Sequence, residues 1–106
     1  MKNISVEELN YKIERDEPFQ LIDLRESYER DSCKMERSEH IPLDKLLSSL
    51  DKLNKDIPVI LHCRTGDRAR AATAALEQKH GFENVYNLEG GIMAWAERYD
   101  PDMEKY

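Results

Sequence analysis

The sequence is poor in cysteine, in long apolar runs and in net positive charge, and each shortage excludes a class of protein. Only two cysteines, Cys33 and Cys63, occur in 106 residues, so a disulfide framework is not expected. No apolar run approaches the roughly 20 residues that cross a membrane. The net charge of −6 argues against general nucleic-acid binding, which requires a basic surface.

A secretory signal is not expected, because the opening residues, MKNISVEELNYK, contain no apolar stretch. We therefore expect a cytoplasmic protein, in which thiols stay reduced. The length fits a single domain over residues 1–106 and leaves little room for a second. Apolar residues make up 40% and charged residues 36%, a composition typical of a globular protein that buries one core.

Helical and strand patterns alternate along the chain. Ser5 and Glu8 have the spacing of a capping box, and Gly81 is well placed to end a helix. The expected helices cover residues 5–16, 43–53, 67–80 and 92–100, and the expected strands cover residues 19–24, 40–42, 58–63 and 84–88. The alternation predicts an α/β fold with a small parallel-stranded sheet and helices on both of its faces.

Two segments carry more specific expectations. Five leucines between residues 43 and 53 fall at helical spacing and predict an amphipathic helix. The charged segment 25–39 is expected to form one or two helical turns and a loop, with its charges on a solvated face.

Cys63 is the last residue of the most apolar predicted strand. In a parallel sheet the functional loops follow the carboxyl ends of the strands, which is where Cys63 is expected to lie. A cysteine in this position is usually a small core residue. The local charge here is about +2, because three arginines (Arg64, Arg68 and Arg70) are opposed by one aspartate, Asp67. The net charge of the whole protein is −6. The amides of the loop and of the helix that follows would favour an anionic sulfur. This combination favours an anion-binding loop around a reactive thiolate.

Two chemistries use such a loop. Cysteine-dependent phosphatases have an arginine after five intervening residues, but Ala69 occupies that position here. Arg68 comes one residue early and Arg70 one residue late. The shorter loop forms a narrower cradle, which suits one extra sulfur atom better than a phosphate. The spacing therefore favours sulfur chemistry over a phosphatase or an arsenate reductase.

The sequence resembles a single-domain rhodanese, a thiosulfate sulfurtransferase-like family, over nearly its whole length. The resemblance rests on LIDLRE…YE, HIPL, VILHCRTGDRA and GFENVYNLEGGIMAW, in this order. Within the family the chain is similar in particular to the rhodanese modules attached to ubiquitin-activating-like sulfur-carrier enzymes.

The resemblance implies that Cys63 is the nucleophile of a thiosulfate or persulfide sulfurtransferase. Its thiolate would take a sulfane sulfur from a small anionic donor, hold it as a persulfide and pass it to a thiophilic acceptor. The amides of Arg64, Thr65, Gly66, Asp67 and Arg68 would cradle the persulfide. Arg64 and Arg68 would attract the donor. No cofactor is expected, and the charge and the lack of apolar runs predict neither a nucleic-acid nor a membrane partner. The resemblance allows a protein as sulfur acceptor.

Other polar residues receive structural interpretations. Asp23 and Arg25 match the family's Asp-x-Arg and are expected to form an ion pair or a hydrogen-bonded anchor near the loop. His40 and His62 are expected to be packed or hydrogen-bonded, and no metal site is predicted, because no second ligand stands at a useful spacing. Cys33 is interpreted as an unremarkable thiol, with a regulatory disulfide to Cys63 as the sharper hypothesis.

One alternative function stays open beside the enzyme. The chain would then be a persulfide carrier or interaction module without significant turnover, whose site is completed by a protein partner.

Overall fold

A parallel five-stranded sheet forms the centre of the molecule. The computed structural model describes residues 1–103; the last three residues of the domain predicted over 1–106 lie outside the described part. The strand order is β1-β5-β4-β2-β3, and every neighbouring pair is parallel. The strands are β1 (Asn3–Ile4), β2 (Gln20–Asp23), β3 (Ser38–His40), β4 (Val59–His62) and β5 (Val85–Leu88).

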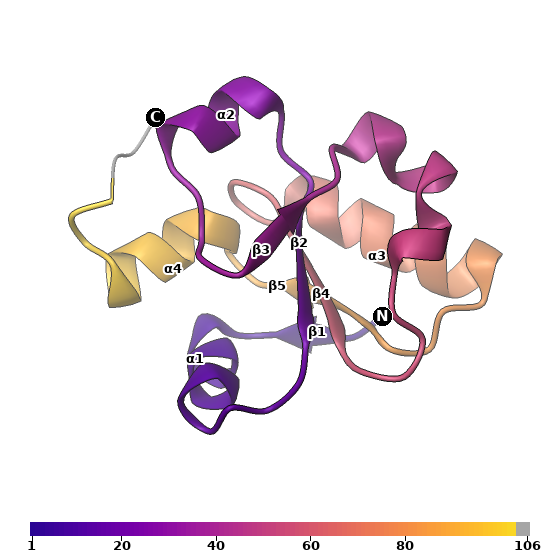
Figure 1. Cartoon of the computed structure of the whole chain (residues 1–106), viewed down its shortest axis with the longest axis horizontal. Helices are drawn as coiled ribbons and strands as arrows, with labels where there is room; N and C mark the ends of the chain where they lie inside the picture. Colours follow the sequence, from indigo (N-terminus) through magenta and orange to yellow (C-terminus); the bar gives the residue numbers. More distant parts are fainter. Residues whose placement is uncertain (104–106) are drawn as a thin grey trace.

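Helices cover both faces of this sheet, as the sequence predicts (Figure 1). They are α1 (Val6–Glu14), α2 (Ser27–Ser32), η1 (Leu43–Ser48), η2 (Leu50–Lys52), α3 (Asp67–His80) and α4 (Gly91–Tyr99). The predicted caps are present: Ser5 and Glu8 exchange two bonds of 3.0 Å at the start of α1, and Gly81, with φ +71°, ends α3. No helix within residues 1–103 combines the length and the apolar composition that a membrane span requires.

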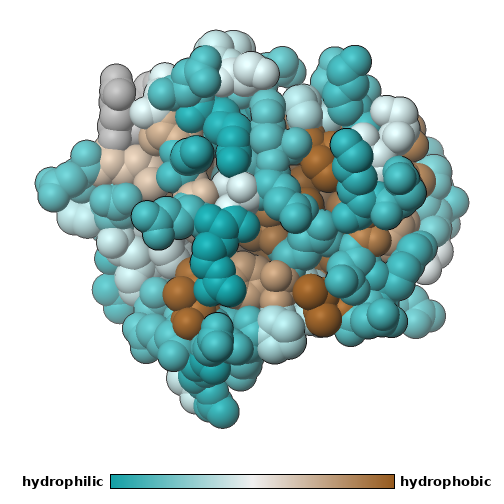
Figure 2. Space-filling model, in the orientation of Figure 1, coloured by the Kyte–Doolittle hydropathy of each residue, from teal (hydrophilic) through white to brown (hydrophobic). Residues whose placement is uncertain are grey.

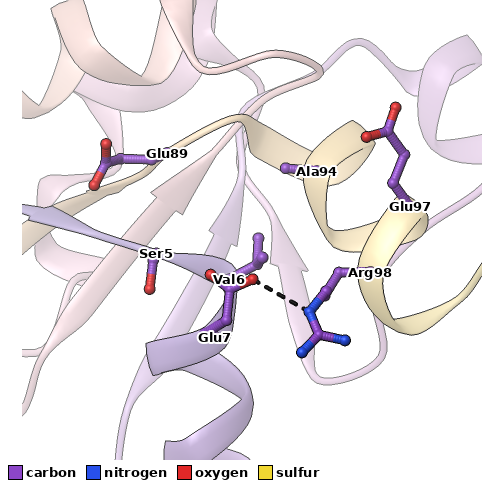
Figure 3. Close-up of a pocket in the computed structure, with 7 residues that line it drawn as sticks. All are labelled: Ser5, Val6, Glu7, Glu89, Ala94, Glu97 and Arg98. Carbon is purple, nitrogen blue, oxygen red and sulfur yellow. Dashed lines mark ion pairs between the residues drawn. The ribbon is translucent and has the colours of Figure 1, made fainter.

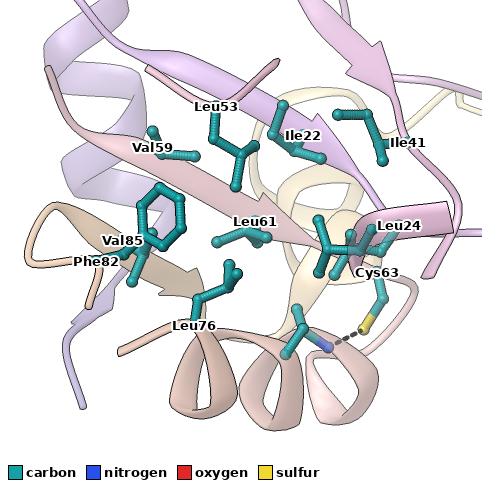
Figure 4. Packing of buried hydrophobic residues seen from close by; sticks show 13 residues of the cluster. Ile22, Leu24, Ile41, Leu53, Val59, Leu61, Cys63, Leu76, Phe82 and Val85 are labelled. Carbon is teal, nitrogen blue, oxygen red and sulfur yellow. Dashed lines mark hydrogen bonds between the residues drawn. The ribbon is translucent and has the colours of Figure 1, made fainter. Parts of the chain in front are cut away.

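Two apolar clusters fill the spaces between the sheet and its helices. One lies between the sheet and α3 and contains Cys63 together with Leu46 and Leu53 (Figure 4). The other lies against α1 and α4 and contains Leu9, Ile60 and Ile92. Figure 2 shows that the outer surface of one face is mostly hydrophilic, with apolar residues in small patches. Burial on both faces explains why β4 reads as a continuous apolar run.

The predicted amphipathic helix over residues 43–53 is wrong in type, because the structure has the two 3-10 turns η1 and η2 there. Their hydrogen bonds join residues three apart, for example from the Lys45 amide to the Pro42 carbonyl at 2.8 Å. Three residues per turn carry Leu46 into the core and leave Leu47 65% exposed. An α-helix would have placed both leucines on one face.

Two strand predictions also differ from the structure. β3 lies two residues before the predicted strand 40–42, because Pro42 has no amide hydrogen with which to continue the ladder. Arg37, with φ +69°, turns the chain just before β3. β1 was not predicted at all, since two residues are too short to show a periodicity.

Candidate active site

The sulfur of Cys63 lies at the carboxyl end of β4, the central strand of the sheet. The residue is only 1% exposed. Its Sγ accepts hydrogen bonds from the amide of Gly66 at 3.1 Å and from the amide of Ala69 at 3.4 Å, the latter drawn as a dashed line in Figure 4. Gly66 adopts φ +109°, which glycine tolerates at no steric cost. The loop therefore folds over the sulfur and directs backbone N–H groups at it, an arrangement that stabilises negative charge.

The start of α4 holds the outer side of this loop. The amide of Ile92 donates to the Cys63 carbonyl at 3.0 Å, and the amide of Met93 donates to the Arg64 carbonyl at 3.1 Å. Gly91 makes this approach feasible, because a Cβ added there would lie 2.5 Å from the Cys63 carbonyl oxygen. These two carbonyls of the loop thus bond to α4, while the amides of Gly66 and Ala69 bond to the sulfur.

The predicted loop residues take different places around this cradle. Thr65 and Asp67 are exposed, whereas Arg64 and Arg68 are half-buried. Asp67 is the first residue of α3 and lies 3.9 Å from the guanidinium of the exposed Arg70. The backbone amides of Gly66 and Ala69 therefore reach the sulfur, whereas the side chains of Thr65 and Asp67 are exposed to solvent.

Arg68 forms a bidentate ion pair with Glu29 of α2. Its Nη1 lies 2.7 Å from Glu29 Oε1, and its Nη2 lies 2.9 Å from Oε2. The Glu29 side chain is 4% exposed and that of Arg68 is 35% exposed. The active loop is thus tied to a helix 39 positions earlier in the chain.

The ion pair predicted between Asp23 and Arg25 is present and completely buried. Arg25 Nε donates to Asp23 Oδ1 at 3.0 Å, and Nη2 donates to Oδ2 at 2.9 Å. Arg30 also donates to Asp23 Oδ2, at 3.0 Å. Burial by itself would raise the pKa of Asp23, but the hydrogen bonds from Arg25 and the nearby positive charges outweigh it and lower this pKa to about 2. Asp23 is therefore a permanent anion at neutral pH.

His62, just before the cysteine, is buried and neutral at pH 7. Desolvation by burial lowers its pKa to about 4, although the charge of Asp23 opposes this shift. Its Nδ1 lies 3.2 Å from the Cys63 carbonyl oxygen and its Nε2 lies 3.9 Å from Asp23 Oδ1. The ring therefore contacts the backbone and the carboxylate, as expected for a packed histidine. His40 is likewise hydrogen-bonded, with Nε2 2.7 Å from the Arg25 carbonyl oxygen.

The two cysteines pack on opposite faces of the sheet. Cys63 belongs to the cluster under α3, whereas half-buried Cys33 packs against the cluster under α1 and α4. The carbonyl of Cys33 accepts a bond of 2.6 Å from Arg25, and its sulfur lies 3.7 Å from the same guanidinium. This separation gives no support to a direct disulfide between the two cysteines.

Three contributors to the site were missed by the sequence interpretation. Glu29 was placed on a solvated charged face, but it and Arg25 are buried. A partial signal was present, since Arg25, Glu29 and Cys33 are spaced four residues apart, although only Glu29 lies within α2. The Ala69 amide and the steric role of Gly91 depend on backbone positions, which no side-chain pattern reveals.

A hollow of about 390 Å³ lies between the start of α1 and the side of α4 that carries Ala94, Glu97 and Arg98 (Figure 3). Glu7, Glu89 and Glu97 line it, and Arg98 pairs with Glu7 at 3.4 Å. Cys63 does not line this hollow. Within residues 1–103 no group of three or more His, Cys, Asp or Glu side chains is placed to hold a metal ion.

The fold and the cysteine loop define the class of protein. The family model described as Rhodanese-like domain matches residues 5–98. The chain therefore belongs to the rhodanese-like domain family.

Individual relatives agree with this assignment. The chain is 36% identical to the putative sulfurtransferase YtwF of Bacillus subtilis, over 95% of this chain and 96% of that protein. It is also 36% identical to the probable adenylyltransferase/sulfurtransferase MoeZ of Mycobacterium tuberculosis. That alignment includes 97% of this chain but only 26% of the longer relative. A rhodanese-like domain protein from Staphylococcus aureus superimposes with a TM-score of 0.83 at 30% identity, covering 90% of this chain and 91% of that one.

Proposed function

We propose that this protein is a sulfurtransferase in which the Cys63 thiolate accepts a sulfane sulfur from thiosulfate or a persulfide donor. The observation that carries the proposal is the buried Cys63 sulfur, which accepts backbone hydrogen bonds from Gly66 and Ala69. The relative YtwF, which aligns over almost its full length, is described as a putative sulfurtransferase and supports the same class. The cytoplasmic location expected from the sequence stays a prediction.

The proposed reaction has two displacements at sulfur. In the first, the Cys63 thiolate attacks the sulfane sulfur, and the donor's S–S bond breaks with its electron pair leaving on sulfite or on a thiolate. In the second, a thiophilic acceptor attacks the outer sulfur, and the electron pair returns to Cys63. The amides of Gly66 and Ala69 stabilise the negative charge on sulfur, an oxyanion-hole function applied to a thiolate.

No histidine base is required in this scheme. His62 is the nearest histidine in sequence, but its Nδ1 faces the Cys63 carbonyl rather than the thiol. The low pKa of about 4 keeps its ring unprotonated at neutral pH. Its proposed task is to fill the core behind the loop beside Asp23.

Sulfur transfer from thiosulfate to cyanide tests the proposed activity. The wild-type protein is expected to form thiocyanate, Cys63→Ser to form none, and Cys33→Ser to retain the wild-type rate. The proposal is contradicted if Cys63→Ser stays active or Cys33→Ser is the variant that loses activity. Hydrolysis of p-nitrophenyl phosphate that depends on Cys63 would instead support the phosphatase alternative.

The carrier alternative has one observation in its favour. An apolar hollow of about 400 Å³ begins at Arg68 and continues between η1 and α3. Leu43 and Leu47 line it and are 38% and 65% exposed, more than a sealed core would leave. A protein acceptor would contact such a surface. Slow transfer to cyanide combined with fast, Cys63-dependent transfer to a thiol-bearing protein would favour the carrier over the enzyme.

A further inference from the structure

Arg68 cannot present its whole guanidinium to a donor, because Glu29 occupies two of its nitrogens. The contacts of 2.7 and 2.9 Å match the planar, bidentate geometry of the strongest arginine–carboxylate pairs. Arg68 also directly precedes Ala69, whose amide reaches the Cys63 sulfur. The carboxylate charge of Glu29 therefore accompanies one of the two arginines that flank the sulfur-binding Ala69.

Several contacts keep Glu29 in place. Its Oε1 accepts a bond of 2.9 Å from the amide of Glu26, which closes the first turn of α2. Arg25 anchors the carboxyl-terminal end of the helix, donating to the Cys33 carbonyl at 2.6 Å and to the Glu29 carbonyl at 3.4 Å. A buried carboxylate with these bonds is costly to move away from its partner.

This pairing changes the charge that an incoming donor meets. The sequence around Cys63 shows three arginines against Asp67, and Glu29 reduces this local formal charge from +2 to +1. Asp67 itself lies 3.9 Å from Arg70, and both side chains are exposed to screening by solvent. Attack on thiosulfate brings a thiolate and a dianion together, so each added negative charge near the loop opposes it.

We propose that Glu29 sets the donor specificity of the active loop, favouring sulfane donors with a single negative charge over dianions such as thiosulfate. This inference rests on the proposed sulfurtransferase function and names the charge class of its donor. Glu29 acts as a positioning residue: it orients Arg68 and offsets its charge, without touching the reacting sulfur.

Two donors of similar shape separate charge from size. Thiosulfate is a dianion, and the methanethiosulfonate anion replaces one of its charged oxygens by a methyl group. With thiosulfate, the Cys63 thiolate gives the Cys63 persulfide anion and sulfite dianion. With methanethiosulfonate, it gives the same persulfide anion and methanesulfinate. Each reaction forms one S–S bond, breaks one, and conserves charge.

The measured quantity is the ratio of kcat/KM for thiosulfate to that for methanethiosulfonate, with cyanide as acceptor. Glu29→Gln keeps the size of the side chain and removes its charge, so the ratio should rise about fivefold or more at low salt. The rise should shrink at about 0.5 M salt, where charges are screened over a few ångströms. Glu29→Asp retains the charge and should keep the wild-type ratio, even if its absolute rates fall.

Glu83→Gln is the matched control, because it changes the net charge equally. Glu83 lies at the amino end of β5, whereas the active loop follows the carboxyl end of the parallel strand β4. The ratio for this control should equal the wild-type value. The inference is overturned if Glu29→Gln leaves the ratio unchanged, or if Glu83→Gln or Glu29→Asp raises it equally. If Glu29→Gln does not fold, Arg68→Gln takes its place; a lower ratio supports the inference and an unchanged ratio overturns it.

The outcome also distinguishes this inference from the proposed function. If neither donor transfers sulfur to Cys63 in the wild-type protein, the sulfurtransferase proposal itself has failed. If both donors react but the ratio of their kcat/KM values does not change with the charge at position 29, only the specificity role of Glu29 has failed.

Discussion

At the scale of single residues, burial decides the charges behind Cys63. Asp23 is fully buried and stays ionised because Arg25 and Arg30 donate to both of its oxygens. His62, also fully buried, stays neutral because desolvation outweighs the attraction of Asp23. Removing one member of a buried ion pair leaves an uncompensated charge, which typically destabilises a protein by about 3–5 kcal/mol. This group of residues therefore supports the fold behind the loop, and the proposed chemistry depends on the sulfur.

His62 makes a pH-dependent contribution to stability. Its pKa is about 4 in the folded protein against 6.5 for the free side chain, so between these values the unfolded chain binds the extra proton. The contribution of the neutral His62 to the free energy of unfolding is fully present above about pH 6.5. It falls by up to about 3 kcal/mol as the pH is lowered towards 4. Urea unfolding of His62→Gln should show a smaller loss over this window than wild type. Equal losses in the two proteins would contradict the buried neutral histidine.

At the scale of elements, the start of α4 shapes the active loop. The amides of Ile92 and Met93 bind the carbonyls of Cys63 and Arg64, and this contact requires a residue without a side chain at position 91. The family-like Gly-Gly sequence is thus explained by the approach of two backbones. Because α4 belongs to one face of the sheet and α3 to the other, the loop is held from both sides.

Gly91→Ala tests this contact. The added Cβ would lie 2.5 Å from one loop carbonyl oxygen and 2.6 Å from the next, so we expect a loss of about 2 kcal/mol or more in stability. Displacement of the loop should slow alkylation of Cys63 by about tenfold or more. Both are measured in a Cys33→Ser background, in which Cys63 is the remaining thiol.

Gly81→Ala provides the matched control for Gly91→Ala. Gly81 also has positive φ, +71°, but a Cβ there would meet nothing within 4 Å. We expect backbone strain of about 1–2 kcal/mol and unchanged alkylation of Cys63. Equal alkylation rates in the two alanine variants would contradict the role of Gly91 in shaping the loop.

At the scale of the whole molecule, much of the fold and the central cysteine could be predicted from patterns. Continuous apolar runs at 19–24 and 58–63 predicted buried parallel strands, and both are confirmed because each strand is covered on two faces. The position of Cys63 followed from the end of the second run. The prediction over residues 43–53 failed because an α-helix and two 3-10 turns show similar leucine spacing, and hydrogen bonding decides between them.

The site was only partly predictable for a related reason. Arg68 is visible in the loop, but its pairing with Glu29 joins segments 39 positions apart and depends on how α2 packs. Residues that act through backbone amides, such as Ala69, leave no signature in their side chains. The sequence near Cys63 therefore suffices to predict a candidate nucleophile, whereas the charge balance around it required the fold.

The central claim is that Cys63 carries the transferred sulfur, and mass spectrometry tests it most directly. The protein is incubated with thiosulfate and, separately, with methanethiosulfonate, and then digested. The account predicts one added sulfur atom on the Cys63 peptide, removed by cyanide or a thiol and absent from Cys63→Ser. Failure of both donors to add sulfur to Cys63, or addition to Cys33 alone, would contradict it.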